Sequence, residues 1–405
     1  MESGLNMLIG VVGKPSVGKS TFFKAATLAE AEIANYPFTT IKPNSGVGFV
    51  RVDCVDKDLG RQCNPRTGYC SKGIRFIPVQ LLDVAGLVPG AHEGKGMGNQ
   101  FLDDLRQADV LIHVIDAAGA TNEKGESVPA GSYDPCNDVE FLEVELDMWY
   151  LGILKKGWEK FSRTVVQEKK EIQAALANQL SGLHVTAPMI EEAILTLNLN
   201  KEKPIQWTDA ELRGLAQELR KKTKPIIIAC NKVDVLVAEK NVQRLRETFP
   251  QYPFIPCSSD SELALKEAAK AGLIDYLPGE KDFKIIHQEK LNERQQKALE
   301  FIQVNVLQKF GSSGVQDVLD KAVFDLLAYV AIYPGGVSKL EDSEGRVLPD
   351  CFLLPAKSTA LDFAYKLHTD LGKSFICAKD VKTKKMLGKE YELKHRDVIE
   401  IVSGR

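Results

Sequence analysis

A glycine-rich segment directly behind a short apolar run constrains this chain more than any other feature. Residues 13–21 read GKPSVGKST, which fits the phosphate-loop pattern G-x-x-x-x-G-K-[ST], and they follow the run LIGVV at residues 8–12. Such a run is typical of a buried parallel strand, and the residues after the loop begin a helix whose free N–H groups attract anions. The alternative, an ordinary glycine-rich turn, explains less of the pattern. We therefore predict a strand–loop–helix unit that binds phosphates.

Every residue of this loop is a candidate phosphate ligand, mostly through its backbone N–H group. Lys19 is expected to reach the β- and γ-phosphates and to stabilise charge on a transferred phosphoryl group, and Ser20 to hold Mg2+ through its hydroxyl. The candidate residues are Gly13, Lys14, Pro15, Ser16, Val17, Gly18, Lys19, Ser20 and Thr21.

A second apolar run, at residues 77–82, leads into the sequence DVAG at 83–86. In this D-x-x-G arrangement a carboxylate at the end of a strand binds Mg2+, and a glycine N–H meets the γ-phosphate. Asp83 is therefore a predicted metal ligand and Gly86 a predicted phosphate ligand. A third run, VLIHVID at 110–116, supplies a neighbouring strand.

A fourth apolar run, at residues 225–230, is followed by Asn231, Lys232 and Asp234 in the spacing N-K-x-D. The carboxylate of Asp234 can accept hydrogen bonds from guanine N1–H and the 2-amino group. Adenine offers neither donor, so binding it would leave that charge unpaired at a cost of about 2 kcal/mol or more. Ser258 and Ser259 come after a further run and are predicted to offer a backbone N–H group to guanine O6.

One threonine of the segment YPFTT at 36–40 is expected to close on Mg2+ when a γ-phosphate is present, as switch loops do. We choose Thr40. Each of the candidate loops follows an apolar run, so they fall at the carboxyl ends of parallel strands, where open α/β sheets bind ligands. We predict a doubly wound, mostly parallel sheet of the phosphate-loop nucleoside triphosphatase class.

The phosphate loop, the segment NYPFTT at 35–40 and the segment GLVPGAHEGKGMGNQF at 86–101 together resemble the Obg-type translation-factor GTPases, and within them the YchF subfamily. The resemblance covers essentially the whole chain. It implies a Mg2+-dependent switch that binds and hydrolyses GTP and associates with the ribosome or RNA. Two alternatives remain open, namely an ATPase of the same family and a nucleotide-gated scaffold for a protein partner.

The sequence departs from related GTPases in a few places. Leu87 stands where many small GTPases carry the glutamine that orients water, which implies slow unassisted hydrolysis. The sequence does not specify which group orients water in place of that glutamine. His92 and His113 are the nearby imidazoles, but we favour the interpretation of His92 as a solvated loop residue and of His113 as a core residue. Ser16 occupies a position that is often asparagine in Obg-type loops, so potassium stimulation stays open. The intact guanine motif favours GTP over ATP.

Four regions follow from the change of pattern along the chain. The G domain is expected at 1–140 and again at 222–336 with trailing helices, interrupted by a helical insertion at 141–221. Apolar spacings of three and four predict one long helix over residues 142–165 and another over 187–197. A further helix is expected from Thr208, with Glu211 completing a capping box.

The remaining region, 337–405, is expected to be a β-grasp domain of the TGS type, which the YchF resemblance also implies. Helical patterns at 292–308 and 315–333 precede it. Strands are predicted at 351–354, 375–378 and 398–402, with a helix at 360–368. A basic run in this domain is a candidate RNA contact, although a solvated hairpin is equally compatible with it. The run consists of Lys379, Lys382, Lys384 and Lys385.

Composition limits the remaining possibilities. With 52 Lys and Arg against 55 Asp and Glu, the net charge of -3 gives no overall attraction to nucleic acid. No apolar run approaches the roughly 18 residues of a membrane span, so we expect a cytoplasmic protein without a membrane partner. The eight cysteines are expected to be reduced. Cys54, Cys63 and Cys70 cluster, but without a C-x-x-C pair or nearby histidine they are interpreted as incidental thiols rather than a zinc site.

Overall fold

The computed structural model describes residues 7–27, 44–84 and 104–404 of the chain. Its contacts divide the chain into two compact units. One contains Leu8–Phe22 and Leu82–Ser258, and the other contains Met1–Met7, Phe23–Leu81 and Ser259–Arg405. We call them the nucleotide unit and the C-terminal unit and describe each by itself. Among the described helices, none is long and apolar enough to cross a bilayer.

The nucleotide unit is built on four parallel strands in the order β1-β5-β6-β7. They are β1 (Leu8–Val12), β5 (Val110–Asp116), β6 (Ile226–Asn231) and β7 (Phe254–Pro256). All residues of β5 and β6 are buried, which is why these strands are continuous apolar runs rather than alternating ones. The predicted mostly parallel α/β sheet is confirmed, and the loops after these strands share one edge.

Helices α1 (Lys19–Thr27) and α9 (Ala238–Thr248) follow β1 and β6, respectively. Strand β4 (Ile74–Asp83) begins in the C-terminal unit, and its last two residues enter the nucleotide unit. Asp83 is therefore delivered to the nucleotide unit by the end of a long strand, as the D-x-x-G pattern predicted.

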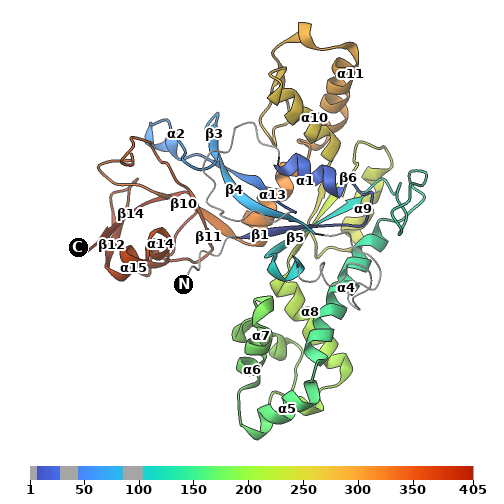
Figure 1. Cartoon of the computed structure of the whole chain (residues 1–405), viewed down its shortest axis with the longest axis vertical. Coiled ribbons are helices and arrows are strands. Elements are labelled where there is room, and N and C mark those ends of the chain that lie inside the picture. The colour runs from blue at the N-terminus through green and yellow to red at the C-terminus, as the bar shows by residue number, and fades with distance from the viewer. Residues whose placement is uncertain (1–6, 28–43, 85–103, 405) are drawn as a thin grey trace. The chain divides into compact units, whose positions relative to one another are not determined.

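The helical insertion is an arm of five α-helices (Figure 1). They are α4 (Cys136–Lys155), α5 (Trp158–Gln167), α6 (Ile172–Gln179), α7 (Ala187–Thr196) and α8 (Asp209–Thr223). Helices α4 and α8 lie side by side, α7 packs against α8 and α6, and α5 lies at the far end of the arm. The long helix predicted over 142–165 is wrong, because the chain breaks at Gly157, whose φ of 72° belongs to the left-handed region. Helix α6 was not predicted.

A buried ion-pair network fixes α8 against α4. Arg220 is 1% exposed, and its guanidinium contacts Asp147 at 2.8 Å and Glu143 at 2.9 Å. The Tyr150 hydroxyl also lies 2.7 Å from that of Thr223. The capping box predicted at Thr208 is present, and it begins α8 one residue later.

The C-terminal unit begins with β2 (Ser45–Asp53), α2 (Asp56–Leu59), β3 (Tyr69–Ser71) and most of β4, and β3 pairs with β4 antiparallel. After the nucleotide unit the chain continues through α10 (Ser259–Lys270), β8 (Ile274–Asp275) and β9 (Lys284–Ile285). Helices α11 (Glu293–Ile302), α12 (Gln308–Phe310) and α13 (Val315–Lys321) come next. Wider helical turns at 303–307 and 322–326 continue α11 and α13.

The chain ends in a five-stranded sheet of order β11-β10-β14-β12-β13 with two helices. Its elements are β10 (Tyr329–Pro334), β11 (Phe352–Pro355), α14 (Ala360–Leu367), α15 (Thr369–Lys373), β12 (Phe375–Asp380), β13 (Met386–Leu387) and β14 (Asp397–Ser403). The predicted strands and helix are confirmed. The helix predicted through residue 333 is wrong at its end, because β10 occupies 329–334 and pairs with β11 and β14.

Candidate nucleotide-binding site

The backbone of the phosphate loop has the close approaches that its glycines predict. A Cβ atom on Gly13 would lie 2.6 Å from the Val114 carbonyl oxygen. One on Gly18, whose φ is 92°, would lie 2.2 Å from the amide nitrogen of Asn231. Ser16 also has a left-handed φ, at 66°. Any larger side chain at the two glycines would push the loop off its neighbours, so the turn requires glycine there.

Lys19 and Asp83 meet beside this loop. The Lys19 ammonium donates a hydrogen bond to the Asp83 carboxylate and another to the Val84 carbonyl oxygen at 2.9 Å. Residue 84 is itself tied to β1, because its N–H donates to the Val11 carbonyl at 3.0 Å. The structure thus brings together the predicted phosphate-binding cation and the predicted metal-binding carboxylate.

The donors at this point fit a Mg2+ ion. Ser20 is exposed in the first turn of α1, and the Asp83 side chain is 26% exposed at the end of β4. Hydroxyl and carboxylate oxygens are the hard ligands that Mg2+ prefers, and it commonly keeps several waters beside them. Ser20 and Asp83 would hold such an ion together with phosphate oxygens.

The Lys14 side chain is buried in the interior of the nucleotide unit. It is 5% exposed, and its ammonium contacts the Asp138 carboxylate at 2.8 Å and the Thr121 carbonyl oxygen at 2.9 Å. It also lies 3.7 Å from the centre of the Tyr133 ring. Burial raises the pKa of Asp138, and the hydrogen bond and charge of Lys14 oppose that rise. This leaves only the backbone of Lys14 available to a phosphate.

The predicted base-reading loop is bonded directly to the phosphate loop. The Asn231 side-chain amide donates to the Val17 carbonyl oxygen at 2.9 Å, and the bond is buried. The Lys232 ammonium donates to the Ser16 carbonyl oxygen at 3.1 Å. Two loops more than 200 residues apart in sequence therefore form one surface.

Asp234 and Ser258 also come together. The Ser258 hydroxyl donates to the Asp234 carboxylate at 2.9 Å, which leaves the other carboxylate oxygen for a ligand. The backbone supports this contact, since the Val233 N–H donates to the Cys257 carbonyl at 3.1 Å. Ser259 is the first residue of α10, is buried, and belongs to the C-terminal unit.

One residue of the site, Asp116, was not predicted from the sequence. Asp116 ends β5, is 1% exposed, and accepts hydrogen bonds from the Lys232 ammonium at 2.8 Å and the Thr121 hydroxyl at 2.5 Å. It therefore positions Lys232, the second residue of the N-K-x-D motif. Its signal was a carboxylate at the carboxyl end of a strand next to β6.

His113 is a core residue. It is 2% exposed in the middle of β5, and burial lowers its pKa to about 3, with a smaller effect from the Lys14 charge. The structure therefore agrees with the core interpretation of this imidazole. Four other predicted positions lie outside the described residues, and their roles stay predictions: Thr40, Gly86, Leu87 and His92.

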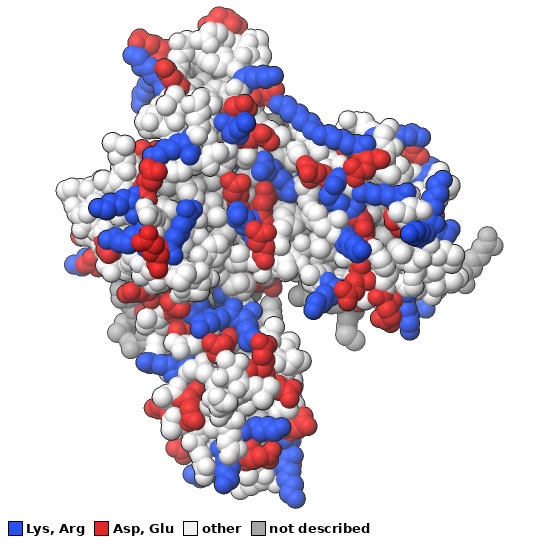
Figure 2. Space-filling model, turned by 180° about the vertical axis from the view of Figure 1, so that it is seen from behind, with Lys and Arg blue, Asp and Glu red and all other residues white. Residues whose placement is uncertain are grey.

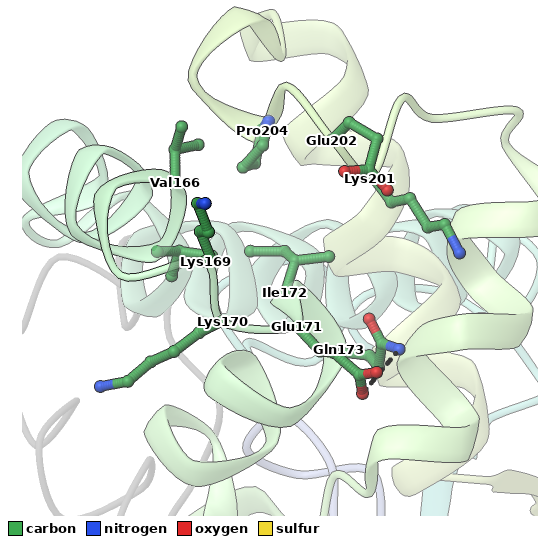
Figure 3. A pocket seen from close by; sticks show the side chains of 10 residues that line it. Val166, Lys169, Lys170, Glu171, Ile172, Gln173, Lys201, Glu202 and Pro204 are labelled. Atoms are coloured by element: carbon green, nitrogen blue, oxygen red, sulfur yellow. Dashed lines mark hydrogen bonds between the residues drawn. The ribbon is translucent and has the colours of Figure 1, made fainter.

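The helical arm has a separate cavity of about 470 Å³ between the α5–α6 connection and the segment at 201–204 (Figure 3). Lysines, glutamates and apolar side chains line it together, and none belongs to a nucleotide loop. The lining residues are Val165, Val166, Lys169, Lys170, Glu171, Ile172, Gln173, Lys201, Glu202 and Pro204.

The basic run of the C-terminal sheet is partly neutralised. Lys379 lies 3.5 Å from Glu400, and Lys382 lies 2.8 Å from Asp58. On the face shown in Figure 2, acidic and basic side chains are mixed, including on the helical arm at the bottom. A contact with RNA phosphates would therefore depend chiefly on the remaining two lysines, Lys384 and Lys385.

Three family models match the chain. The 50S ribosome-binding GTPase model matches residues 8–136, and the model described as Obg-like GTPase YGR210-like, G4 motif-containing domain, matches 229–336. The TGS domain model matches 344–403. These three regions contain the phosphate loop, the base-reading loop, and the C-terminal sheet except for its strand β10, respectively.

The chain is similar over nearly its full length to known proteins. An uncharacterized GTP-binding protein of Methanocaldococcus jannaschii is 52% identical over 398 residues, which cover 98% of this chain and 99% of the relative. The ribosome-binding ATPase YchF of Bacillus subtilis is 28% identical over 419 residues, covering 96% and 97%. The crystal structure of a GTP-binding protein from Pyrococcus horikoshii OT3 superposes with a TM-score of 0.78 at 40% identity, covering 98% and 100%.

Proposed function

Because the chain belongs to the YchF/Obg-like family of GTP-binding proteins, we propose that it is a Mg2+-dependent switch that hydrolyses GTP and acts on the ribosome. The observation that carries this proposal is the continuous surface formed by the phosphate loop and the base-reading loop. Asn231 and Lys232 bond to carbonyls of the phosphate loop, so a nucleotide with its phosphates beside Lys19 has its base beside Asp234.

Guanine is the base that this surface suits. The Asp234 carboxylate would accept hydrogen bonds from N1–H and the 2-amino group, while the Ser258 hydroxyl donates a hydrogen bond to one of its oxygens. Asp116 keeps Lys232 in place through a contact in which the carboxylate is fully buried and the lysine side chain is 28% exposed. Adenine would leave the carboxylate without its donors, at a cost of about 2 kcal/mol or more.

Hydrolysis in this proposal depends on stabilising charge at the phosphates. Lys19 would leave Asp83 for the β- and γ-phosphates and stabilise the charge that develops on the transferred group. Ser20 and Asp83 would hold the metal, and bound Mg2+ would neutralise phosphate charge. No buried general base is required, which fits the neutral, solvent-inaccessible state of His113. A bound partner would supply the water-orienting group.

A ribosomal partner is supported by the relatives. The family model that matches residues 8–136 is described as a ribosome-binding GTPase, and the Bacillus subtilis relative is named a ribosome-binding ATPase. In this proposal the helical arm and the TGS-type sheet take part in that contact.

The name of the Bacillus subtilis relative also favours a second candidate, a ribosome-binding ATPase. Titration calorimetry with GTP and with ATP, each with Mg2+, separates the two functions. We expect GTP to bind at least about 30-fold more tightly, which corresponds to about 2 kcal/mol. Equal or tighter ATP binding would replace the GTPase proposal with the ATPase.

The base-reading role is tested by Asp234→Asn. The amide oxygen can still accept from N1–H, but the amide NH2 group faces the 2-amino group of guanine, donor against donor, whereas the 2-oxo group of xanthine can accept from it. We expect the variant to lose most of its GTP affinity and to gain affinity for xanthosine triphosphate. The matched control is Asp282→Asn, an exposed carboxylate outside the nucleotide loops, which should bind as the original chain does. Unchanged GTP affinity in Asp234→Asn would remove Asp234 from the site.

A further inference from the structure

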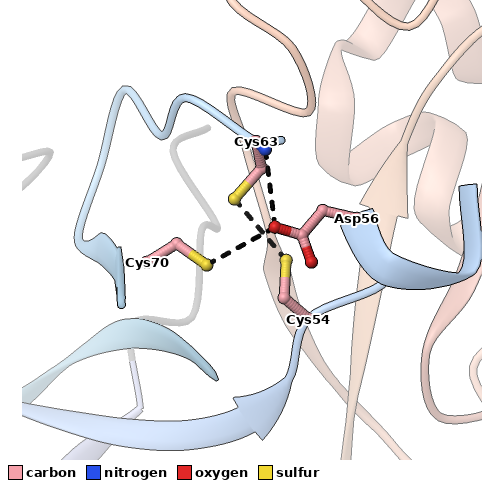
Figure 4. A group of neighbouring side chains, drawn as sticks. All are labelled: Cys54, Asp56, Cys63 and Cys70. Atoms are coloured by element: carbon pink, nitrogen blue, oxygen red, sulfur yellow. Dashed lines mark hydrogen bonds between the residues drawn. The ribbon is translucent and has the colours of Figure 1, made fainter. Parts of the chain in front are cut away.

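The connection between β2 and β4 brings three cysteines and one aspartate to a single point (Figure 4). Cys54 follows β2, Asp56 begins α2, Cys63 lies in the next loop and Cys70 is the central residue of β3. One ligand atom from each lies within 4.8 Å of all the others. The sequence pattern favoured incidental thiols because it has no C-x-x-C pair and no nearby histidine to complete a zinc site, and the fold supplies Asp56 as a fourth donor.

The spacing of these atoms fits a tetrahedral ion. The sulfurs of Cys54 and Cys63 are 3.6 Å apart, and the Cys70 sulfur lies 3.8 Å from an Asp56 carboxylate oxygen. With Zn–S bonds of about 2.3 Å and a Zn–O bond of about 2.1 Å, a tetrahedron places two sulfurs about 3.8 Å apart and a sulfur and an oxygen about 3.6 Å apart. A disulfide needs an S–S distance of about 2.05 Å, and the three thiols are free of one.

The site is closed to solvent on most sides. Cys54, Asp56 and Cys63 are 1%, 4% and 6% exposed, and Cys70 is half-buried. They adjoin an apolar cluster that contains Tyr333, among others. A carboxylate in such surroundings is costly unless its oxygens are paired, yet Asp56 Oδ1 is buried with no hydrogen-bond partner among the described residues. A bound cation would compensate for that burial.

A positive side chain already accompanies the cluster. Arg75 is completely buried on β4, and its guanidinium donates to the carbonyl oxygens of Leu348 at 3.1 Å and Pro349 at 2.9 Å. Its charge acts on the thiols of both Cys54 and Cys63. Three thiolates, one carboxylate and one divalent cation carry two net negative charges, of which Arg75 offsets one.

We propose that Cys54, Asp56, Cys63 and Cys70 bind one Zn2+ ion with a structural role. Three thiolates select a soft cation such as Zn2+ over Mg2+ or Ca2+. Four protein ligands complete a tetrahedron and leave no open position for a substrate, which is the mark of a structural site. None of its ligands belongs to a nucleotide loop, so the zinc proposal is tested independently of the GTPase proposal.

The ion would stabilise the surface on which the C-terminal sheet rests. Around the four ligands, the Arg396 guanidinium donates to the Asp53 carbonyl oxygen at 2.8 Å and contacts the Asp58 carboxylate at 2.9 Å. Lys382 contacts the same carboxylate at 2.8 Å, and Arg66 pairs with Asp350 at 2.7 Å. Most of these exposed pairs are weak singly, and a bound ion would add to the rigidity of the loop that carries them.

The first test is the metal content of the full chain, purified anaerobically with a thiol reductant and without a metal-affinity tag. Mass spectrometry of the elements should find about one zinc per chain. Replacement by Co2+ should produce the thiolate charge-transfer absorption and the visible bands of a tetrahedral site. A chain that takes up neither ion during anaerobic reconstitution, or that instead contains a Cys54–Cys63 disulfide, would overturn the proposal.

The second test uses variants. Cys63→Ser and Asp56→Ala should lower zinc content at least tenfold, whereas Cys377→Ser, which removes a thiol from β12, should leave it unchanged. If a variant is insoluble, the cobalt spectrum of the original chain still tests for three thiolate ligands in a tetrahedral site, and fewer thiolates would contradict the proposed ligand set. Chelation should lower the unfolding temperature of the original chain and of Cys377→Ser, but not of Cys63→Ser. Zinc retained at full occupancy by Cys63→Ser would contradict this ligand set.

Discussion

At the scale of single residues, the site depends on side chains that position others. Asp116 does not belong to any predicted motif, yet it holds Lys232 at 2.8 Å with its carboxylate fully desolvated. Removing it would free Lys232 from one anchor and leave the Thr121 hydroxyl without its acceptor. The consequence should appear in base recognition rather than in phosphate binding.

We therefore predict that Asp116→Ala weakens GTP and GDP binding by about tenfold or more, which corresponds to about 1.4 kcal/mol. Inorganic triphosphate, which lacks a base, should bind the variant as it binds the original chain. Titration calorimetry with the three ligands measures this, with Asp282→Asn as the control. Equal losses for all three ligands would mean that Asp116 supports the phosphate loop instead.

His113 gives a prediction about pH. Its pKa in the fold is about 3, against an ordinary value of 6.5, because burial excludes the charged form. Between these values the unfolded chain holds a proton that the folded chain does not, so this residue makes the fold less stable as the pH falls. The slope from one such group approaches about 1.4 kcal/mol per pH unit.

His113→Leu should remove that contribution. Denaturant unfolding at pH 7 and pH 5 should show a smaller loss of stability in His113→Leu than in the original chain. Because the comparison is between two pH values, a general cost of the substitution cancels, and an unchanged slope in His113→Leu would contradict the assigned pKa.

At the scale of elements, much of the fold could be predicted because its signals are local. The phosphate loop, the D-x-x-G turn and the N-K-x-D turn each follow an apolar run, and the order of those runs fixes the edge on which they meet. Asp116 and the zinc ligands could not be predicted in the same way. Cys54, Asp56, Cys63 and Cys70 become neighbours only because the connection between β2 and β4 folds back on itself.

In the helical arm the prediction was wrong although the local signal was strong. Apolar residues keep helical spacing across Gly157, so periodicity predicted one helix where the chain forms two. Periodicity reports which side of the chain is buried, but a left-handed residue interrupts the helix without disturbing that pattern. A glycine between two lysines and a tryptophan was the available signal.

This break can be tested with two glycines that differ only in backbone conformation. An added Cβ meets nothing within 4 Å at either Gly157, which has a φ of 72°, or Gly152, which lies inside α4. Gly157→Ala should destabilise the chain by about 1 kcal/mol, and Gly152→Ala should stabilise it by about 0.5–1 kcal/mol. Denaturant unfolding followed by circular dichroism measures both. The same sign for both substitutions would refute the break at Gly157.

At the scale of the whole molecule, the nucleotide should control engagement of the ribosome. We predict that the chain cosediments with ribosomes more strongly with a non-hydrolysable GTP analogue than with GDP or without nucleotide. In the Lys19→Ala variant, cosedimentation should no longer differ between these nucleotide states. The variant lacks the ammonium group that contacts Asp83 and that is predicted to bind the β- and γ-phosphates. Equal cosedimentation in all three states would contradict control by the nucleotide and would favour a scaffold whose partner binding does not depend on it.

The central claim is that one surface holds both ends of a guanine nucleotide. A crystal structure of the chain with Mg2+ and a non-hydrolysable GTP analogue tests it most directly. We predict phosphates within the loop at 13–21, the Lys19 ammonium moved from Asp83 to the phosphate oxygens, and the guanine edge on the Asp234 carboxylate. A nucleotide bound at any other place, or a base that does not contact Asp234, would contradict the account.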